Sequence, residues 1–182
     1  FCCFIDTKKA YDRVFRAGLW KMVWEKGIRG KMFRVLKCLY AEVESCVLVN
    51  GKRTGWFSVG VGVRQGCVLS PVLFAIFIDG VAEDLRELGI GVPIGEEVLS
   101  LLMYADDIVL MAESEEDLQK MLNVVYKYSV RWRFELSESK TEIVVFGGKV
   151  EEGWGGFRVG EKVLKVVNGY RYLGIEVKKN LS

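Results

Sequence analysis

The chain has 182 residues, of which 51% are apolar, so it has the length of one domain and enough apolar material for a sizeable core. It contains no histidine, which excludes Ser-His-Asp and Cys-His nucleophile systems and every zinc site that needs imidazole. The formal net charge is +2 at pH 7, and no apolar run approaches the roughly 18 residues of a membrane span.

The charges are unevenly spread along the sequence. Residues 1–55 carry 12 basic and 5 acidic side chains (net +7), residues 56–118 carry 2 and 12 (net −10), and residues 119–182 carry 12 and 7 (net +5). Basic segments suit a polyanion and an acidic segment suits metal ions. A mixed, solvated surface is the alternative interpretation of the same counts.

Five cysteines occur at positions 2, 3, 38, 46 and 67, with no Cys-x-x-Cys pair. This pattern argues against a disulfide framework and for a reducing, intracellular compartment. We expect the cysteines to be small, buried apolar residues. The apolar start, Phe1 to Phe4, is too short for a signal peptide, and the chain lacks an initiator methionine. We therefore expect a fragment of a longer frame that begins at a strand.

In chain order, the first half alternates between apolar stripes and turn signals. Phe1 to Asp6 is typical of a short buried strand. Asn50-Gly51 is a hairpin turn signal, and Ser70-Pro71 predicts a helix start with Ser70 as cap and Pro71 at the first helical position. The further predicted elements are the helices Leu19–Lys26 and Lys31–Glu44, the strands Ser45–Val49 and Gly55–Val61, and the helix Ser70–Leu88.

The second half begins with a loop or short strand at residues 89–95. Apolar runs at Leu99–Tyr104 and Ile108–Met111 predict a hairpin with two aspartates at its tip, and a capping-box pattern at Ser114–Asp117 opens a helix. The last predicted strands are Glu142–Phe146, Phe157–Val166 and Tyr172–Val177. This order predicts an α+β fold, with an antiparallel sheet and helices packed on one face, rather than a doubly wound parallel fold.

Asp106 and Asp107, at the tip of the predicted hairpin, are the leading candidates for chemistry. Adjacent aspartates are also common in plain turns, where they cap nearby N–H groups. The flanking apolar runs predict strands buried on both faces, so the two charges would lie at the edge of a dry core, where a divalent cation offsets their repulsion. Asp6 likewise ends an apolar strand, although capping is its alternative role. Three carboxylates at one sheet end can hold two metal ions, and oxygen ligands favour Mg²⁺ or Mn²⁺.

Gly62 to Pro71 forms a glycine-flexible loop that leads into a helix N-terminus. Glycines let the backbone approach a substrate closely, and helix N-termini favour phosphate. A loop with a helix cap and no ligand is the alternative interpretation of this segment.

Five short motifs, in this order, resemble those of reverse transcriptases. They are Phe4–Asp12 (FIDTKKAYD), Arg64–Pro71 (RQGCVLSP), Tyr104–Asp107 (YADD), Lys140–Glu142 (KTE) and Tyr172–Gly174 (YLG). The resemblance spans nearly the whole chain and is greatest to non-LTR (LINE-type) retrotransposon enzymes, while group II intron and other bacterial reverse transcriptases share parts of it. It implies that residues 1–182 are a polymerase palm that lacks the upstream fingers and the downstream thumb.

The resemblance also implies a role for each motif residue. Asp6, Asp106 and Asp107 would be the catalytic metal ligands, and Lys140, otherwise an ordinary surface lysine, would be catalytic as a proton donor to pyrophosphate. The nucleotide-binding residues would be Tyr11, Arg64, Gln65 and Gly66, and the primer grip would be Tyr172, Leu173 and Gly174. Tyr11 would exclude a 2′-OH, although a core aromatic is its alternative role, and Asp12 is expected to form a helix cap or a salt bridge.

The implied activity is RNA-directed DNA polymerisation with two Mg²⁺ ions (Mn²⁺ being possible), in which a deoxynucleotide is added to a primer 3′-OH. The implied partners are an RNA template, a DNA primer and dNTP, with no membrane, and the nucleus is the expected location for a eukaryotic LINE-type element. We expect the isolated chain to extend primers poorly, because fingers and thumb are missing. Two alternatives stay open, namely another palm-type enzyme such as a nucleotidyl cyclase, and a decayed or repurposed RNA-binding copy without catalysis.

Overall fold

The structure, a computed structural model, describes residues 1–148, 150 and 154–179. The chain divides into two compact units. The sheet unit consists of Phe1–Lys8 and Ile78–Ser182, and the loop unit consists of Lys9–Phe77. Within the described residues, no helix combines the length and the apolar character that a membrane span requires.

A five-stranded sheet forms the centre of the sheet unit. Its strand order is β13-β10-β1-β9-β8, and β1 lies in the middle between two antiparallel neighbours. The strands are β1 (Cys2–Ile5), β8 (Leu101–Tyr104), β9 (Asp107–Met111), β10 (Glu142–Val144) and β13 (Lys165–Val167). The mixed α+β prediction is confirmed.

The prediction of a purely antiparallel sheet is wrong at one edge, because β13 pairs with β10 in parallel. A parallel neighbour needs a connection long enough to return the chain to the same end of the sheet. The 20 residues that separate Val144 from Lys165 are sufficient for this return, and they include the small hairpin of β11 (Arg158–Val159) and β12 (Lys162–Val163).

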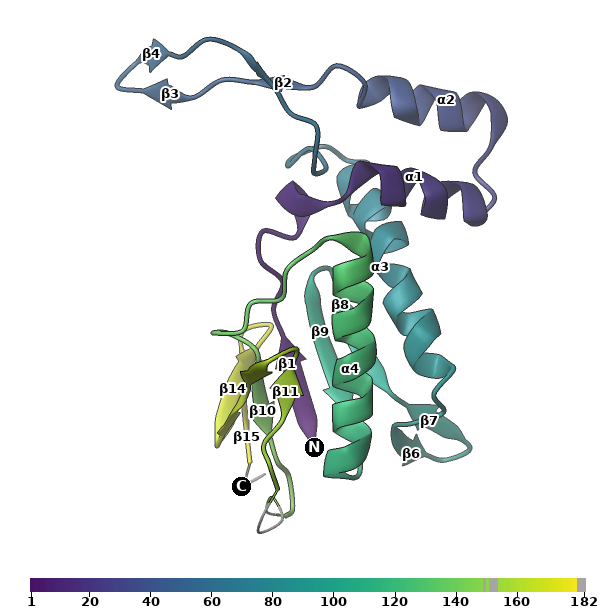
Figure 1. The fold of residues 1–182 in the computed structure, drawn as a ribbon, viewed down its shortest axis with the longest axis vertical. Helices are drawn as coiled ribbons and strands as arrows, with labels where there is room; N and C mark the ends of the chain where they lie inside the picture. The colour runs from purple at the N-terminus through teal and green to yellow at the C-terminus, as the bar shows by residue number, and fades with distance from the viewer. Residues whose placement is uncertain (149, 151–153, 180–182) are drawn as a thin grey trace. The chain divides into compact units, whose positions relative to one another are not determined.

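The two faces of the sheet are covered by different elements (Figure 1). On one face, a core cluster of Phe4, Val109 and Val144 packs against the hairpin of β14 (Gly169–Tyr172) and β15 (Ile175–Lys178). Side chains alternate along a strand, so the buried neighbours of these residues point to the other face. Helix α4 (Glu115–Trp132) packs against β9 there.

Helix α4 begins and packs as its sequence pattern predicts. Ser114 is the N-cap, and its hydroxyl accepts a hydrogen bond from the Asp117 N–H at 3.2 Å. The buried stripe includes Leu118, Met121, Leu122 and Val125, which is the helical spacing of an amphipathic helix.

Two further elements contact α4. The Gln119 side chain exchanges two hydrogen bonds with the backbone of Arg158 in β11, each 2.8 Å long. The later residues of α3 (Ser70–Arg86) approach α4 at Gly80, where an added Cβ would lie 2.7 Å from the Tyr128 hydroxyl oxygen. Between α3 and β8 in the chain lies the hairpin of β6 (Val92–Ile94) and β7 (Glu97–Leu99). β6 falls within residues 89–95, where the sequence predicted a loop or short strand, and the pairing with β7 was not predicted.

The loop unit contains a 3-10 turn, helices and a narrow ribbon. The turn is η1 (Tyr11–Arg13), and the helices are α1 (Arg16–Glu25), α2 (Gly30–Leu39) and the first residues of α3. The ribbon pairs β2 (Glu44–Ser45) with β5 (Phe57–Ser58) and β3 (Leu48–Val49) with β4 (Lys52–Arg53). Asn50 and Gly51 both have positive φ at its tip, as the Asn-Gly signal predicts for a type I′ turn.

Several local predictions are wrong. β8 is an edge strand with alternating exposure, so the expectation that both runs around the aspartates are buried on both faces holds only for β9. Ser70 does not precede α3 as a cap but lies in its first turn, where its hydroxyl donates to the carbonyl oxygen of Arg64. The predicted strand Tyr172–Val177 is a hairpin that turns at Leu173-Gly174.

The cysteines also depart from their prediction. All five thiols are free, as expected, but only Cys3 is buried, and Cys38 is exposed on α2. The predicted helix Lys31–Glu44 ends five residues early, because the chain turns at Tyr40 and enters the ribbon at Glu44.

The N-cap of α4 provides a test of this part of the fold. Ser114→Ala removes the acceptor for the Asp117 N–H and should lower the free energy of unfolding by about 1 kcal/mol. Chemical denaturation followed by circular dichroism measures the change. Ser114→Asp keeps an acceptor at this position and should retain most of the stability; equal losses in both variants would contradict the cap.

Candidate active site

The register between β1 and β9 brings two carboxylates together. Ile5 pairs with Ile108 in this antiparallel ladder, so the next residues along, Asp6 and Asp107, stand opposite each other at the strand ends. Asp106 lies beside them in the two-residue turn that joins β8 to β9. The structure thus brings together the three aspartates that the sequence singled out.

The turn that presents Asp106 is strained. Tyr104 pairs with Asp107 across the hairpin, which leaves Ala105 and Asp106 as the loop. Ala105 has φ +53°, a left-handed conformation that costs an alanine roughly 1 kcal/mol. Strain of this kind persists only where the surrounding structure enforces it, as in a short hairpin between two paired strands.

The electrostatics of Asp107 reflect its neighbours. Partial burial raises the pKa of its carboxyl group, and the charges of Asp106 and then Asp6 raise that pKa further, while Lys140 lowers it. Each charge that raises the pKa disfavours the ionised form of Asp107. The site therefore concentrates negative charge where a cation would be stabilising.

Lys140 is the cation that the structure places beside this group. Its Nζ atom lies 3.6 Å from Oδ2 of Asp6, with the lysine side chain 68% exposed and the aspartate side chain 22% exposed. An ion pair with this exposure contributes little to stability. Its significance is positional, because it places an ammonium group at the edge of the carboxylate cluster.

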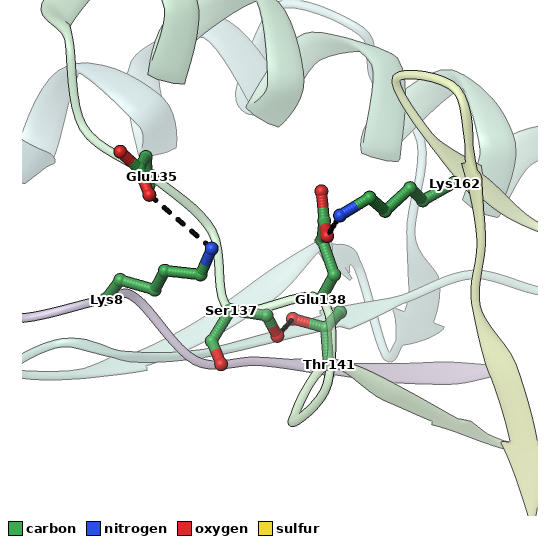
Figure 2. A network of polar contacts seen from close by, with 6 residues as sticks. All are labelled: Lys8, Glu135, Ser137, Glu138, Thr141 and Lys162. Atoms are coloured by element: carbon green, nitrogen blue, oxygen red, sulfur yellow. Dashed lines mark hydrogen bonds and ion pairs between the residues drawn. The ribbon is translucent and has the colours of Figure 1, made fainter.

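The segment before Lys140 is fastened to the end of β1. The Ser137 N–H donates to the Asp6 carbonyl oxygen at 2.7 Å, and the Lys8 N–H donates to the Glu135 carbonyl oxygen at 2.8 Å. Figure 2 shows the side chains around these bonds, where Lys8 pairs with Glu135 at 3.4 Å. The segment that carries Lys140 is therefore held to the strand that carries Asp6.

A tight turn completes this segment. The Thr141 N–H and hydroxyl both donate to the Ser137 carbonyl oxygen, at 2.8 Å and 2.9 Å, and Glu138 pairs with Lys162 of β12 (Figure 2). Lys140 thus extends from a turn that is closed by its own backbone and tied to a neighbouring hairpin.

The hairpin of β14 and β15 lies on the same face of the sheet as the carboxylates. Asp6 follows Phe4 by two residues and Asp107 precedes Val109 by two, so they share the face on which Phe4 stacks on Tyr170, with ring centroids 4.4 Å apart. Burial raises the pKa of Tyr170, and so do the charges of Asp6 and Asp107. Burial and Asp107 raise the pKa of Tyr172 in the same way.

The tip of this hairpin is formed by Leu173 and Gly174, with φ values of +47° and +83°. Leucine rarely occupies this left-handed region, which favours glycine and asparagine. Among the predicted primer-grip residues, Leu173 and Gly174 thus form an exposed, strained turn, and the partly exposed Tyr172 beside them is influenced by the charge of Asp107. Tyr170 was not singled out by the sequence analysis; its two-residue spacing from Tyr172 in a strand is the signal that would have found it.

The chemistry of the donor set fits a divalent cation, because Asp6, Asp106 and Asp107 offer only hard oxygen atoms and repel one another. In the part of the chain that the structure describes, no group of three or more His, Cys, Asp or Glu side chains is gathered closely enough to hold a metal ion. The mutual charge effects and the strand register establish that the three are neighbours, whereas a ligand set requires their oxygen atoms to converge further. The metal site stays a prediction.

The predicted nucleotide-binding residues all belong to the loop unit. Tyr11 stacks on Phe74, with ring centroids 4.9 Å apart. The guanidinium group of Arg64 lies over the ring of Tyr40 at 5.7 Å, and Gln65 and Gly66 are exposed at the tip of their loop.

Asp12 has a different partner from the one that the sequence suggested. Its carboxylate accepts a hydrogen bond from Nε2 of Gln65 at 2.9 Å, instead of capping a helix or pairing with a cation. The bond connects the first and second motifs across 53 residues of sequence, so no local pattern could have indicated it.

Gly62 allows the segment before the second motif to lie close to the end of the first motif. It has φ +77°, and a Cβ on this residue would lie 2.5 Å from the Asp12 carbonyl oxygen, well inside contact distance. Only glycine allows both the conformation and the approach.

The charge cluster gives a prediction about pH. Because the pKa of Asp107 is raised in the folded chain, folding favours its protonated form, and this residue becomes increasingly destabilising as the pH rises above its ordinary pKa. Without divalent cations, Asp107→Asn should therefore raise the thermal midpoint at pH 7 more than at pH 3. Scanning calorimetry at both values measures the difference.

Asp117 is the matched control, since hydrogen bonds from Lys120 and Ser114 lower its pKa. The sign is reversed there: its contribution is present at pH 7 and is lost as the pH falls. Asp117→Asn should lower the thermal midpoint at pH 7 and have less effect at pH 3. A shift for Asp107→Asn that does not depend on pH would contradict the charge cluster.

Gly62 gives a second prediction. Gly62→Ala should lower the free energy of unfolding by about 2–4 kcal/mol, from left-handed strain together with steric overlap. Urea denaturation measures it, with Gly60→Ala as the control, because a Cβ at Gly60 meets nothing within 4 Å. Equal stability of the two variants would show that the close approach to Asp12 does not exist.

Comparisons with known proteins identify the family to which the chain belongs. The family model described as "Reverse transcriptase (RNA-dependent DNA polymerase)" matches residues 1–177. Over 186 aligned residues the chain is 25% identical to the RNA-directed DNA polymerase from mobile element jockey of Drosophila funebris, covering 99% of this chain and 20% of that protein. Over 123 residues it is 32% identical to the Pol polyprotein from type-1 retrotransposable element R2 of Nasonia vitripennis, covering 68% and 12%.

A solved structure shares the fold. Telomerase from Candida albicans superposes with a TM-score of 0.65 at 14% identity, covering 97% of this chain and 29% of that one. The chain spans a fifth or less of the length of the two curated relatives. The ordered motifs, the family match over residues 1–177 and these relatives lead to one conclusion: the chain belongs to the reverse transcriptase family and is related to the polymerases of non-LTR retrotransposons.

Proposed function

We propose that this chain is the palm of an RNA-directed DNA polymerase from a non-LTR retrotransposon, acting within a longer protein that supplies fingers and a thumb. The carrying observation is the juxtaposition of Asp6, Asp107 and Lys140 at one end of the sheet, with Asp106 in the adjoining turn. Two-metal phosphoryl transfer needs carboxylates at one site and no protein nucleophile, which suits a chain without histidine.

Asp6, Asp106 and Asp107 would hold two divalent ions, Mg²⁺ or Mn²⁺. Bound there, such ions supply Lewis-acid stabilisation of the attacking 3′-oxygen and of the charge on the triphosphate. Lys140 would then act twice, one role after the other. Its ammonium group would stabilise charge on the leaving pyrophosphate, and it would donate a proton to that group.

The remaining motif residues would bind the substrates. The turn Tyr172–Gly174 would hold the primer end beside the carboxylates, which fits the influence of Asp107 on Tyr172. The ring of Tyr11, held against Phe74, would exclude a 2′-OH, so that deoxynucleotides are preferred. Arg64, Gln65 and Gly66 would contact the incoming nucleotide and the template.

The partners on this proposal are an RNA template, a DNA primer and dNTP. The basic segments 1–55 and 119–182 carry the charge that such polyanions require. The polymerase would act inside the cell, in the nucleus if the element is eukaryotic.

The decisive test is primer extension. A chimeric polymerase that places residues 1–177 between the flanking segments of the Drosophila funebris jockey protein should add deoxynucleotides to a primer on an RNA template. Asp106→Asn, which removes one ligand charge, should lower the extension rate by about 1,000-fold or more. Asp117→Asn, at a partly exposed aspartate on α4, should leave the rate unchanged.

Full extension by the Asp106→Asn chimera would contradict the metal assignment. Salt-sensitive RNA binding that ignores both Mg²⁺ and the aspartates, without any extension by the parent chimera, would instead favour a repurposed RNA-binding copy.

A further inference from the structure

Arg16, the first residue of α1, is a half-buried arginine with an unusual set of acceptors. Its guanidinium group donates to four backbone carbonyl oxygens, those of Val59 (2.7 Å), Gly62 (2.9 Å), Tyr40 (3.2 Å) and Val61 (3.2 Å). Its Cζ atom also lies 5.1 Å from the centre of the Tyr40 ring. One side chain therefore joins the start of α1, the end of α2 and the segment that follows the ribbon.

Three of the four acceptors lie in the residues just before Gln65. We define residues 59–66 as the anchored loop. Two of its amides are also bonded to the backbone around the end of the first motif: the Gly62 N–H donates to the Val14 carbonyl oxygen at 2.9 Å, and the Val63 N–H donates to that of Tyr11 at 2.7 Å. The base of the anchored loop is thus fixed from both sides.

The tip of the anchored loop has the opposite character. Gly62 and Val63 are buried, whereas Arg64, Gln65 and Gly66 are exposed. Among the residues that the structure describes, the Gln65 side chain bonds to Asp12, two residues before Val14. An exposed residue on a fixed base can be presented to a ligand in one orientation, which lowers the entropic cost of binding.

Tyr40 extends the support to the second motif. The Arg64 N–H donates to its hydroxyl oxygen at 3.5 Å, and that hydroxyl lies 3.3 Å from the hydroxyl of Ser70. Ser70 in turn donates to the Arg64 carbonyl oxygen. Because Arg16 bonds the carbonyl of Tyr40 and lies over its ring, it holds the residue on which the other end of the anchored loop rests.

The chemistry requires arginine at this position. A guanidinium group offers five N–H donors in a planar fork, which can reach several carbonyl oxygens at once. A lysine ammonium group is a compact charge on a flexible stem and cannot span the same set. Methionine fills similar space and would leave all four carbonyl oxygens without this donor.

We propose that Arg16 is a positioning residue for nucleotide selection: by fixing the anchored loop, it sets Gln65 and Tyr11 in register with each other. This inference rests on the proposed function for its consequence, because Gln65 and Tyr11 are the residues that would meet the incoming nucleotide. Its structural part, the fixing of the loop by Arg16, is independent of any activity.

Hydrogen exchange on the 182-residue chain tests the structural part. Arg16→Met should speed exchange of the Gly62 and Val63 amides by about 10-fold or more, because a charge-assisted bond is worth at least this factor in a local opening equilibrium. Arg16→Lys should give an intermediate value. Amides of α4 should be unaffected in both variants, which shows that the sheet unit remains folded. Arg34→Met, an exposed arginine on α2, is the matched control and should leave all of these rates unchanged.

Kinetics in the chimeric polymerase test the consequence. Arg16→Met should raise the KM for dNTP about 10-fold and lower the preference for dNTP over rNTP by a similar factor, with a smaller change in kcat. Asp12→Ala tests the tip of the anchored loop independently of its base. It removes the partner of Gln65, so it should raise the KM while leaving Gly62 and Val63 exchange unchanged.

The outcomes distinguish failure of the inference about Arg16 from failure of the proposed polymerase function. Unchanged exchange of Gly62 and Val63 in Arg16→Met would overturn the inference, whatever the activity. Faster exchange with unaltered KM and sugar preference in an active chimera would overturn the link to nucleotide selection. Failure of the parent chimera to extend a primer would contradict the proposed function, and the exchange data would then still decide whether Arg16 fixes the loop.

Discussion

The antiparallel pairing of β1 with β9 is the constraint from which the candidate active site follows. Once Ile5 stands opposite Ile108, the residues that leave the two strands, Asp6 and Asp107, must stand opposite each other as well. Like charges in opposed positions are unfavourable. Burial raises the pKa of Asp107, the charge of Asp106 raises it further, and the opposed charge of Asp6 adds to both. The apolar ladder behind them stabilises the register, because a slip of one residue would turn every buried side chain of β1 toward the wrong face.

The same alternation connects the carboxylates to the hairpin of β14 and β15. Asp6 shares its face of the sheet with Phe4, and the ring of Phe4 packs against the rings of Tyr170 and Tyr172. A face that is apolar along the strands and acidic at their ends therefore lies under one hairpin, whose turn is exposed. The packing of Phe4 against Tyr170 and Tyr172 thus connects the position of that turn to the strand that carries Asp6.

Both units obtain a fixed geometry at an exposed tip by fastening the chain just behind it. In the sheet unit, Lys140 extends from a turn whose Ser137 is bonded to the backbone of Asp6. In the loop unit, Gln65 extends from a loop whose base is held by Arg16 and by the backbone of Tyr11. In each case the side chain that would meet a substrate makes few contacts, and the residues behind it make many. This division allows a group to be accessible to solvent and still be oriented.

The sequence by itself determined the local elements and the chemical types of the site. Apolar runs ending in aspartate, the Asn-Gly turn, the Ser114 cap and the five ordered motifs all depend on residues close in the chain. The structure contains the predicted hairpins and the Ser114 cap, and the roles of the motif residues stay predictions. The tertiary structure decided the rest. It set the parallel partner of β10, the exposure of β8, the hairpin turn within the predicted strand Tyr172–Val177, and the hydrogen bonds of Asp12 and Arg16. These depend on contacts across tens of residues, as between Asp12 and Gln65, and local propensity carries no information on which distant carbonyl or amide a side chain will meet.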